Sequence, residues 1–468
     1  MSNFITFKCD YFIDHSCFLY DIENSNKKQG MILMIKKQQL QSSKKPLMSS
    51  PTLKLSSFCL ASLIASTTLQ AATPEQIKTV VQAEESAYLE TLKNLVEIES
   101  GSKDIEGLNQ IAKVVAEQLK AAGAEVSIIQ SQDIYRMDDT PEQVGPMIKA
   151  VLKGKGKSKI MMIAHMDTVY QKGMLKDQPF KIEGDKVYGL GIIDDKQGVT
   201  SILHVLNTLK KLNYKDYGTI TVLMNSDEEI SSPGSRKLIT ETAQNQDVVF
   251  SFEGGGKDGN LRLATSGIGA AYLEIKGKSS HAGVKPEAGV NALTELSHQI
   301  IQLQNLSNPD TGLKLNWTVA EAGKTRNVIP DHATAQADVR ALRVEDFDQV
   351  EKTLQEKIKN KKLADSQVSV KFEVRRPPLS ANDASKKLAE KAQQIYKNEL
   401  NIPLTVSLTP TGGGTDAAFA GVKSKAAVIE GMGLSGDGSH SSNAEYILKD
   451  TIVPRLYLAT RLIVDLSK

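Results

Sequence analysis

The sequence predicts an α/β protein with a mixed, mostly parallel sheet and a second, smaller α/β unit inserted into it. Apolar strands alternate with helical patterns from residue 126 to 252. The order strand–helix–strand–strand–helix–strand then occupies residues 268 to 374, and the first pattern resumes after Pro377-Pro378. A length of 468 residues is more than one ordinary core needs, so two domains are expected.

The first part of the chain carries most of the parallel sheet. Helices are expected at 74–98 and 105–123, because apolar residues recur there at helical spacing. Alternation of strands and helices indicates a sheet that is covered on both faces. The strands expected here are 126–129, 147–152, 160–164, 219–224 and 248–252, with helices at 196–212 and 234–242.

The inserted unit has the βαββαβ order of a ferredoxin-like domain. Its expected strands are 270–276, 315–320, 333–339 and 368–374, and its helices are 292–303 and 347–358. A helix at 384–397, a strand at 426–429 and a helix at 452–466 follow. The expected domains are therefore a larger discontinuous domain, 72–265 with 379–468, and a small domain inserted into it at 266–378.

Residues 1–71 are expected to be a leader, with a signal peptide at about 48–71. An apolar run from Leu55 to Ala65 follows Lys54, and small residues end it at Ala71-Ala72, which predicts export to the periplasm or the medium. All three cysteines lie in this leader, so the processed chain would have no disulfide and no thiolate ligand. The leader holds eight lysines and four acidic residues, and its loss would lower the formal charge by four, from +2 to −2. Neither nucleic acid nor a membrane anchor is expected as a partner after processing.

The candidate chemistry begins at the end of the strand 160–164. His165 and Asp167 point to the same side because side chains alternate along a strand, and a carboxylate beside an imidazole can orient it as a metal ligand. Taken alone, this pair is more simply interpreted as a strand that runs into a polar turn. Further candidates follow other apolar strands: Asp194 and Asp195, Glu228 and Glu229, Glu253, and His440 in a Gly-rich turn.

Each of these residues has a simpler interpretation by itself. Asp195 could cap the following helix, and Gly189-x-Gly191 lacks the spacing of a dinucleotide-binding loop. The other four histidines (His15, His204, His298 and His332) are expected to be structural or surface residues. Together, however, two histidines and three carboxylates at strand ends predict a dinuclear site for divalent ions such as zinc.

These motifs resemble the M20 family of zinc peptidases and amidohydrolases. The resemblance extends from about Ile77 to the C-terminus. It is greatest to the bacterial glutamate carboxypeptidases of the carboxypeptidase G type, through the stretches 165–170, 216–221, 316–318 and 411–418. It implies a zinc-peptidase-like catalytic domain and two zinc ions per subunit. Asp194 would bridge the ions, His165 and Glu253 would complete one site, and Glu229 and His440 would complete the other.

The resemblance also implies roles for residues around the ions. Glu228 would be the general base, Asp167 would orient His165, and the Asp194–Asp195 peptide is expected to be cis. His281 would stabilise the oxyanion from the partner subunit of a homodimer. The substrate contacts would come from Arg340, Asn327, Gly414 and Thr415. Two positions depart from the family pattern, namely Gly254, where relatives often have proline, and Gln197, where glycine is common.

The expected function is hydrolysis of the amide bond to a C-terminal amino acid, with glutamate preferred. Small N-acyl amino acids, folates included, or peptides would be the substrates. An M20 deacylase or dipeptidase remains an alternative, because such enzymes share the metal site. An exported metal- or peptide-binding protein without catalysis is an alternative of another class, and it predicts damage to the base or the ligands.

Overall fold

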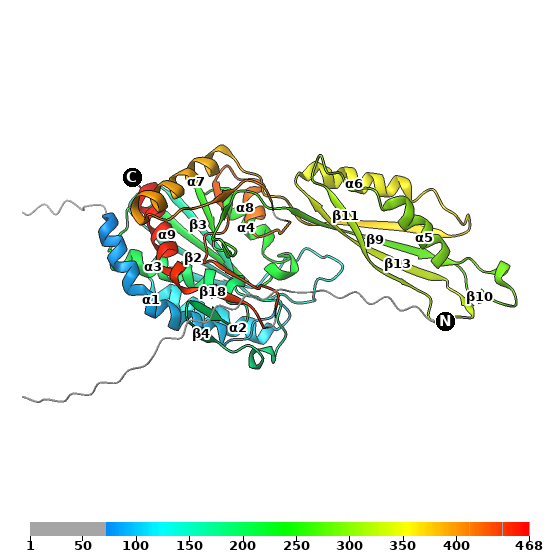
Figure 1. Ribbon diagram of the computed structural model, residues 1–468, viewed down its shortest axis with the longest axis horizontal. Helices are drawn as coiled ribbons and strands as arrows, with labels where there is room; N and C mark the ends of the chain where they lie inside the picture. Colours follow the sequence, from blue (N-terminus) through cyan, green and yellow to red (C-terminus); the bar gives the residue numbers. More distant parts are fainter. Residues whose placement is uncertain (1–71, 411, 442, 468) are drawn as a thin grey trace, which may run out of the picture. The chain divides into compact units, whose positions relative to one another are not determined.

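The computed structural model describes residues 72–410, 412–441 and 443–467 (Figure 1). The expected signal peptide and the three cysteines lie outside these residues. Within them, no helix is both long and apolar enough to cross a bilayer.

A six-stranded mixed sheet forms the centre of the larger hydrophobic core. Its order is β1-β2-β6-β3-β7-β16, and β6, β3, β7 and β16 pair in parallel while β1 and β2 are antiparallel additions. This confirms the predicted fold class. The strands are β1 (Glu125–Ile129), β2 (Met147–Lys153), β3 (Lys159–His165), β6 (Thr219–Asn225), β7 (Val248–Ser251) and β16 (Ala427–Ile429).

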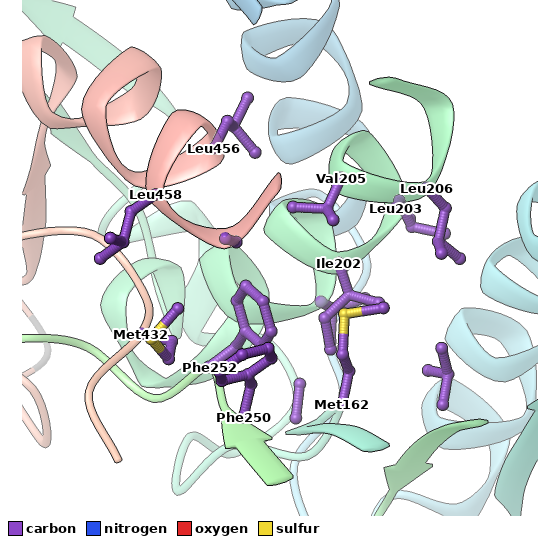
Figure 2. Packing of buried hydrophobic residues seen from close by; sticks show 14 of the residues in the cluster. Met162, Ile202, Leu203, Val205, Leu206, Phe250, Phe252, Met432, Leu456 and Leu458 are labelled. Atoms are coloured by element: carbon purple, nitrogen blue, oxygen red, sulfur yellow. The ribbon is translucent and has the colours of Figure 1, made fainter. Parts of the chain in front are cut away.

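Helices cover both faces of this sheet. In β3, Met162 packs into one cluster with α3 and α9, whereas Ile163 on the opposite face packs into another with α4 and α8. Figure 2 shows Met162 and Phe250 of the sheet beside Ile202 of α3. Full burial of such a side chain contributes about 1.5–3 kcal/mol, which explains the apolar run of β3. The helices are α1 (Pro74–Val96), α2 (Ile105–Ala121), α3 (Gln197–Lys211), α4 (Arg236–Ala243), α7 (Asp383–Ile395), α8 (Ala417–Gly421) and α9 (Ile452–Leu466).

A second sheet is antiparallel and has its own hydrophobic cluster. Its order is β11-β13-β9-β14, and α5 and α6 cover one face only. The chain order β9-α5-β11-β13-α6-β14 is the predicted βαββαβ arrangement. The opposite face carries polar side chains such as Tyr272, Gln336 and Arg340. The elements are β9 (Gly267–Lys276), α5 (Ala292–Leu303), β11 (Lys314–Ala322), β13 (His332–Ala341), α6 (Val344–Lys357) and β14 (Gln367–Arg376).

Several short strands are absent from the sequence prediction. A small antiparallel sheet, β17-β18-β5-β4, joins residues 181–188 to residues 436–448. Strands of two or three residues have no periodicity that could predict them. The members are β4 (Lys181–Glu183), β5 (Lys186–Tyr188), β17 (Gly436–Asp437) and β18 (Tyr446–Leu448), and two further pairs are β8 (Leu261–Arg262) with β15 (Val406–Ser407) and β10 (Ser280–His281) with β12 (Val328–Ile329).

A substitution at Phe347 tests whether the second sheet has a hydrophobic core of its own. Phe347 of α6 is 1% exposed in this core, so Phe347→Ala should lower the free energy of unfolding of the sheet by about 3–5 kcal/mol. The only tryptophan, Trp317, lies on β11, so its fluorescence during urea unfolding reports on this sheet. Val344→Ala, at an exposed position of the same helix, is the control. An unchanged midpoint for Phe347→Ala would contradict the assignment.

Candidate metal centre

The turns at the carboxyl ends of three central strands meet at one edge of the sheet. His165 closes β3, Glu253 follows β7, and Glu228 and Glu229 begin a short helical turn (Glu228–Ile230) after β6. Asp194 lies in the irregular turn Ile192–Lys196, and its peptide bond to Asp195 is cis, as expected from the resemblance. Ligands of open α/β sheets collect at this edge.

The five expected ligands come together around Asp194. Its Oδ1 lies 3.0 Å from His165 Nε2, and its Oδ2 lies 3.3 Å from His440 Nε2. Glu253 Oε1 is 3.6 Å from His165 Nε2 on one side. On the other side, Glu229 Oε2 is 3.3 Å from His440 Nε2. Asp194 therefore lies between two histidines, each of which has a second carboxylate beside it.

The donor set fits divalent metal ions. Two sets of donor atoms lie close enough together to hold an ion, one from His165, Asp194 and Glu229 and one from His165, Asp195 and Glu253. Glu229 Oε1 is also buried without a hydrogen-bond partner. A buried carboxylate oxygen without a partner is costly unless a cation satisfies it. Imidazole and carboxylate donors in this number are those of zinc sites.

The raised pKa values of residues in this cluster indicate that it lacks positive charge to balance its carboxylates. Burial raises the pKa of Glu253 well above its ordinary value, and it raises the pKa of Glu229 to about 7. Hydrogen bonds to Asp194 and Glu229 raise the pKa of His440 to about 10. Although burial opposes it, the surrounding carboxylates also raise the pKa of His165. A divalent cation would replace these protons, as metal binding generally does.

Asp167 connects the end of β3 to the turn that carries Glu228 and Glu229. Its Oδ1 and Oδ2 accept the backbone N–H groups of Glu228 and Glu229, each at 3.1 Å. Ser102 Oγ donates to Oδ2 at 2.7 Å. His165 Nδ1 lies 3.0 Å from the backbone oxygen of Asp167 and 3.3 Å from its carboxylate. Asp167 thus holds the imidazole by its main chain as well as by its side chain.

Arg376 is a site residue that sequence reasoning missed. Its Nη1 lies 2.6 Å from Glu228 Oε1, and its Nη2 donates to the backbone oxygen of Glu228 at 2.7 Å. A β-bulge between Val374 and Arg376 turns the arginine away from the helix-covered face of β14. The arginine pair before two prolines was the only signal in the sequence. Burial raises the pKa of Glu228 well above its ordinary value, and Arg376 partly opposes this shift.

Glu445 is a second residue that the sequence did not reveal. Its Oε1 accepts the N–H groups of Ile193 at 2.9 Å and Asp194 at 3.2 Å. Its Oε2 accepts the N–H of Gly191 at 2.9 Å and the hydroxyl of Tyr170 at 2.5 Å. This buried carboxylate therefore fixes the turn that carries Asp194.

Gln197, noted above as a departure from the family pattern, is fully buried in the same region. Its amide donates to Asp195 Oδ1 at 2.8 Å and to the backbone oxygen of Phe252 at 2.9 Å. It also accepts the N–H of Leu434 at 2.7 Å. The larger side chain thus joins three loops, and Phe252 directly precedes Glu253.

Two expected substrate residues lie away from the metal ligands. His281 and Asn327 are exposed neighbours on the β10–β12 ribbon, where the N–H of Ala282 donates to the backbone oxygen of Asn327 at 2.9 Å. Within the described ranges, no hydrogen bond or ion pair joins His281 to the ligand cluster. The N–H groups of Gly283 and Val284 donate to His281 Nδ1, both at 3.1 Å, so Nε2 carries the proton.

Two of the other expected contacts, Arg340 and Gly414, border the expected metal ligands. A cleft of about 520 Å³, here the first cleft, is lined by Glu228, Glu229 and His440 and by Arg340 and Gly414, among others. A side chain at position 414 would clash, because an added Cβ would lie 2.8 Å from the backbone oxygen of Ser266. Arg340 Nη1 donates to the backbone oxygen of Gly412 at 3.1 Å. Thr415 Oγ1 is buried without a hydrogen-bond partner.

A cluster of histidines and carboxylates at the carboxyl edge of such a sheet defines the class of metal-dependent hydrolases. Residues 161–465 match the profile of peptidase family M20/M25/M40. Carboxypeptidase G2 of Pseudomonas sp. (strain RS-16) is 46% identical over 385 residues, which cover 82% of this chain and 90% of that protein. The chain therefore belongs to this peptidase family, and it is a metallo-carboxypeptidase or amidohydrolase.

The chain is also similar to more distant proteins, and the solved structures among them share its fold. Succinyl-diaminopimelate desuccinylase of Rickettsia bellii (strain OSU 85-389) is 26% identical over 312 residues, 62% of this chain and 77% of that protein. The M20 family metallo-carboxypeptidase Sso-CP2 from Sulfolobus solfataricus has a TM-score of 0.64 at 15% identity, with 81% of this chain and 99% of that chain covered. Aminopeptidase PepT from Bacillus cereus has a TM-score of 0.66 at 23% identity, with 82% and 99% covered.

The raised pKa values predict how pH affects the metal-free protein. The pKa values of Glu229, Asp227 and Glu445 are raised to about 7, and that of His440 to about 10. Between pH 6 and 8 the folded chain thus binds more protons than the unfolded chain, and its stability falls as pH rises. The melting temperature after chelation should be lower at pH 8 than at pH 6. Excess zinc should remove most of this difference, and a rise in the metal-free value would contradict the prediction.

Glu445 should control metal affinity without contacting the ions. Glu445→Gln keeps the shape but replaces a carboxylate that accepts three backbone N–H groups by an amide, so the turn of Asp194 should lose its position. We expect a 10- to 100-fold lower zinc affinity in chelator competition. Glu430→Gln is the matched control, because Glu430 is equally buried but pairs with Arg262. Equal zinc affinities in the two variants would contradict the role.

Proposed function

We propose that the chain is an exported di-zinc carboxypeptidase that hydrolyses the amide bond to a C-terminal amino acid, most readily glutamate. One observation carries the proposal: the first cleft joins the metal ligands to three arginines, Arg340, Arg375 and Arg376. Guanidinium groups bind a carboxylate with two parallel hydrogen bonds, and a C-terminal amino acid always has a carboxylate. The similarity to carboxypeptidase G2 over most of both chains supports the same substrate class.

The residues proposed to hold the two ions are those of the cluster around Asp194. His165 and Glu253 would hold one ion, Glu229 and His440 the other, and Asp194 would contact both. Zinc ions held by these residues would supply Lewis acidity, which lowers the pKa of a water molecule and polarises the substrate carbonyl.

Glu228 is proposed as the general base. Its carboxylate takes a proton from the attacking water and returns it to the leaving amine, so one group serves both steps. A raised pKa suits this role, because a base that is to give its proton back must not be too acidic. Arg376 fixes the carboxylate from the opposite side, which keeps Oε1 in one position.

The βαββαβ sheet is proposed to act as the lid and dimerisation domain, with boundaries at 266 and 378. Arg340 on its polar face would bind the terminal carboxylate. His281 would donate its Nε2–H to the oxyanion from the partner subunit of a homodimer, with Asn327 beside it. The exposure of both residues and the fixed tautomer of His281 support this arrangement. Export rests on the apolar segment before Ala72 and on its small residues alone.

A deacylase of the same family is the second candidate, because the desuccinylase relative covers much of the chain. A panel of N-acylated amino acids and free dipeptides separates the two functions. Faster turnover of N-acyl-glutamates than of other N-acyl amino acids favours the carboxypeptidase. Equal or faster turnover of acetylated amino acids would reject it.

The base is tested by Glu228→Gln, which keeps a hydrogen-bond acceptor for Arg376. The rate should fall by about 10² to 10⁴, because the amide cannot take a proton. Zinc content, measured by mass spectrometry, should remain at two ions per chain, since Glu228 is not a ligand. More than a few per cent of the original activity would show that another group is the base.

A further inference from the structure

A second cleft adjoins the candidate metal centre at Glu229. It has a volume of about 730 Å³ and is lined by residues 101–104, 168–172, 229 and 230. Glu229 also lines the first cleft. The two clefts therefore share one of the proposed metal ligands.

The floor of the second cleft is held firmly against the metal ligands. Residues 100–102 pair with residue 168, since the N–H of Ser102 donates to the backbone oxygen of Thr168 at 3.1 Å and the N–H of Thr168 donates to that of Ser100 at 2.9 Å. The hydroxyl of Ser102 donates to Asp167, which in turn binds the turn of Glu229. Groups on this floor thus have fixed positions relative to the site of hydrolysis.

The direction of the substrate follows from the proposed function, on which this inference rests. A scissile amide has an amino-acid half and an acyl half, on opposite sides of the carbonyl carbon. Arg340 of the first cleft is the residue proposed to bind the half that ends in a carboxylate. The acyl half must then leave the metal centre on the side of the second cleft, whose volume is in the range for ligands much larger than acetyl.

The charges of the second cleft indicate which acyl groups it prefers. Lys172 is already paired with Glu106 at 2.7 Å and lies 4.0 Å from Asp104. Asp104 also caps α2 through the N–H of Gly107 at 3.2 Å. Lys103 is exposed and has no hydrogen bond or ion pair within residues 72–410, 412–441 and 443–467. The cleft thus offers one unpaired cation beside apolar surface from Val169 and Ile230.

We propose that the second cleft is the acyl subsite, that it takes large acyl groups with an apolar body and a negatively charged end, and that Lys103 determines the preference for that charge. An exposed ammonium group discriminates charge at moderate strength, because water screens it. The expected effects are therefore changes in relative rates rather than loss of catalysis.

The experiment compares three substrates that share C-terminal glutamate: N-acetyl-, N-benzoyl- and N-(4-carboxybenzoyl)-glutamate. With the zinc-loaded chain, kcat/KM should rise from acetyl to benzoyl and rise again for 4-carboxybenzoyl. Lys103→Glu should lower the ratio of 4-carboxybenzoyl to benzoyl at least tenfold and change the benzoyl value less than threefold. Lys103→Gln should lower the ratio by a smaller factor.

Lys157→Glu is the matched control, since Lys157 is exposed and unpaired among the described residues but precedes the amino end of β3, remote from His165. It should leave the ratio unchanged. An equal shift in both variants would indicate a general charge effect and overturn the subsite. An unchanged ratio in Lys103→Glu, with N-acyl-glutamates still hydrolysed, would overturn the subsite but not the proposed function.

A third variant tests the direction of the substrate. Arg340→Ala should lower kcat/KM for all three substrates by a similar factor, because it acts on the amino-acid half. If Arg340→Ala changes the acyl preference and Lys103→Glu does not, the two clefts have been assigned in the wrong order. Failure of the unaltered zinc-loaded chain to hydrolyse any N-acyl amino acid would overturn the proposed function and the subsite with it.

Discussion

The need to hold several carboxylates together in a buried place determines the local structure around the site. Glu229 and Glu253 both approach Asp194, although burial and repulsion between carboxylates disfavour the charged forms of the two glutamates. For the neighbouring carboxylates, part of the cost of burial is offset by hydrogen bonds and an ion pair. Backbone N–H groups donate to Asp167 and Glu445, and Arg376 pairs with Glu228. A bound cation would relieve the remaining electrostatic cost of the buried carboxylates. This cost in the metal-free chain therefore contributes to its affinity for metal.

The fold supplies these compensating groups from distant parts of the sequence. The carboxyl edge of the parallel strands provides four of the acidic side chains, while the small sheet β17-β18-β5-β4 brings residues 436–448 beside residues 181–188. His440 and Glu445 both lie between β17 and β18; His440 contacts the side chain of Asp194, and Glu445 accepts its backbone N–H. A sheet of only short strands thus has a large effect on the geometry of the site.

The main elements were predictable from the sequence, and so was the proximity of the residues expected to be ligands, for different reasons. Helices such as 292–303 and 452–466 were placed correctly because their apolar residues repeat at helical spacing. His165 and Glu253 were found because they follow apolar strands directly. Glu445 and Arg376 were missed because their roles depend on partners more than 140 residues away, which no local pattern encodes. The small sheet was missed because its strands are too short to have a period.

The bulge in β14 shows that the number of residues in a strand can determine where a charged side chain points. Val374 stands opposite Gly269, and Arg376, not Arg375, stands opposite Ile268. With regular pairing, Arg375 would take that place and Arg376 would turn toward α5 and α6, away from Glu228. A related strand that is one residue shorter before its two prolines would present a single arginine to the first cleft. The length of this strand, as well as its composition, therefore has to be compared when substrate preference is inferred from alignment.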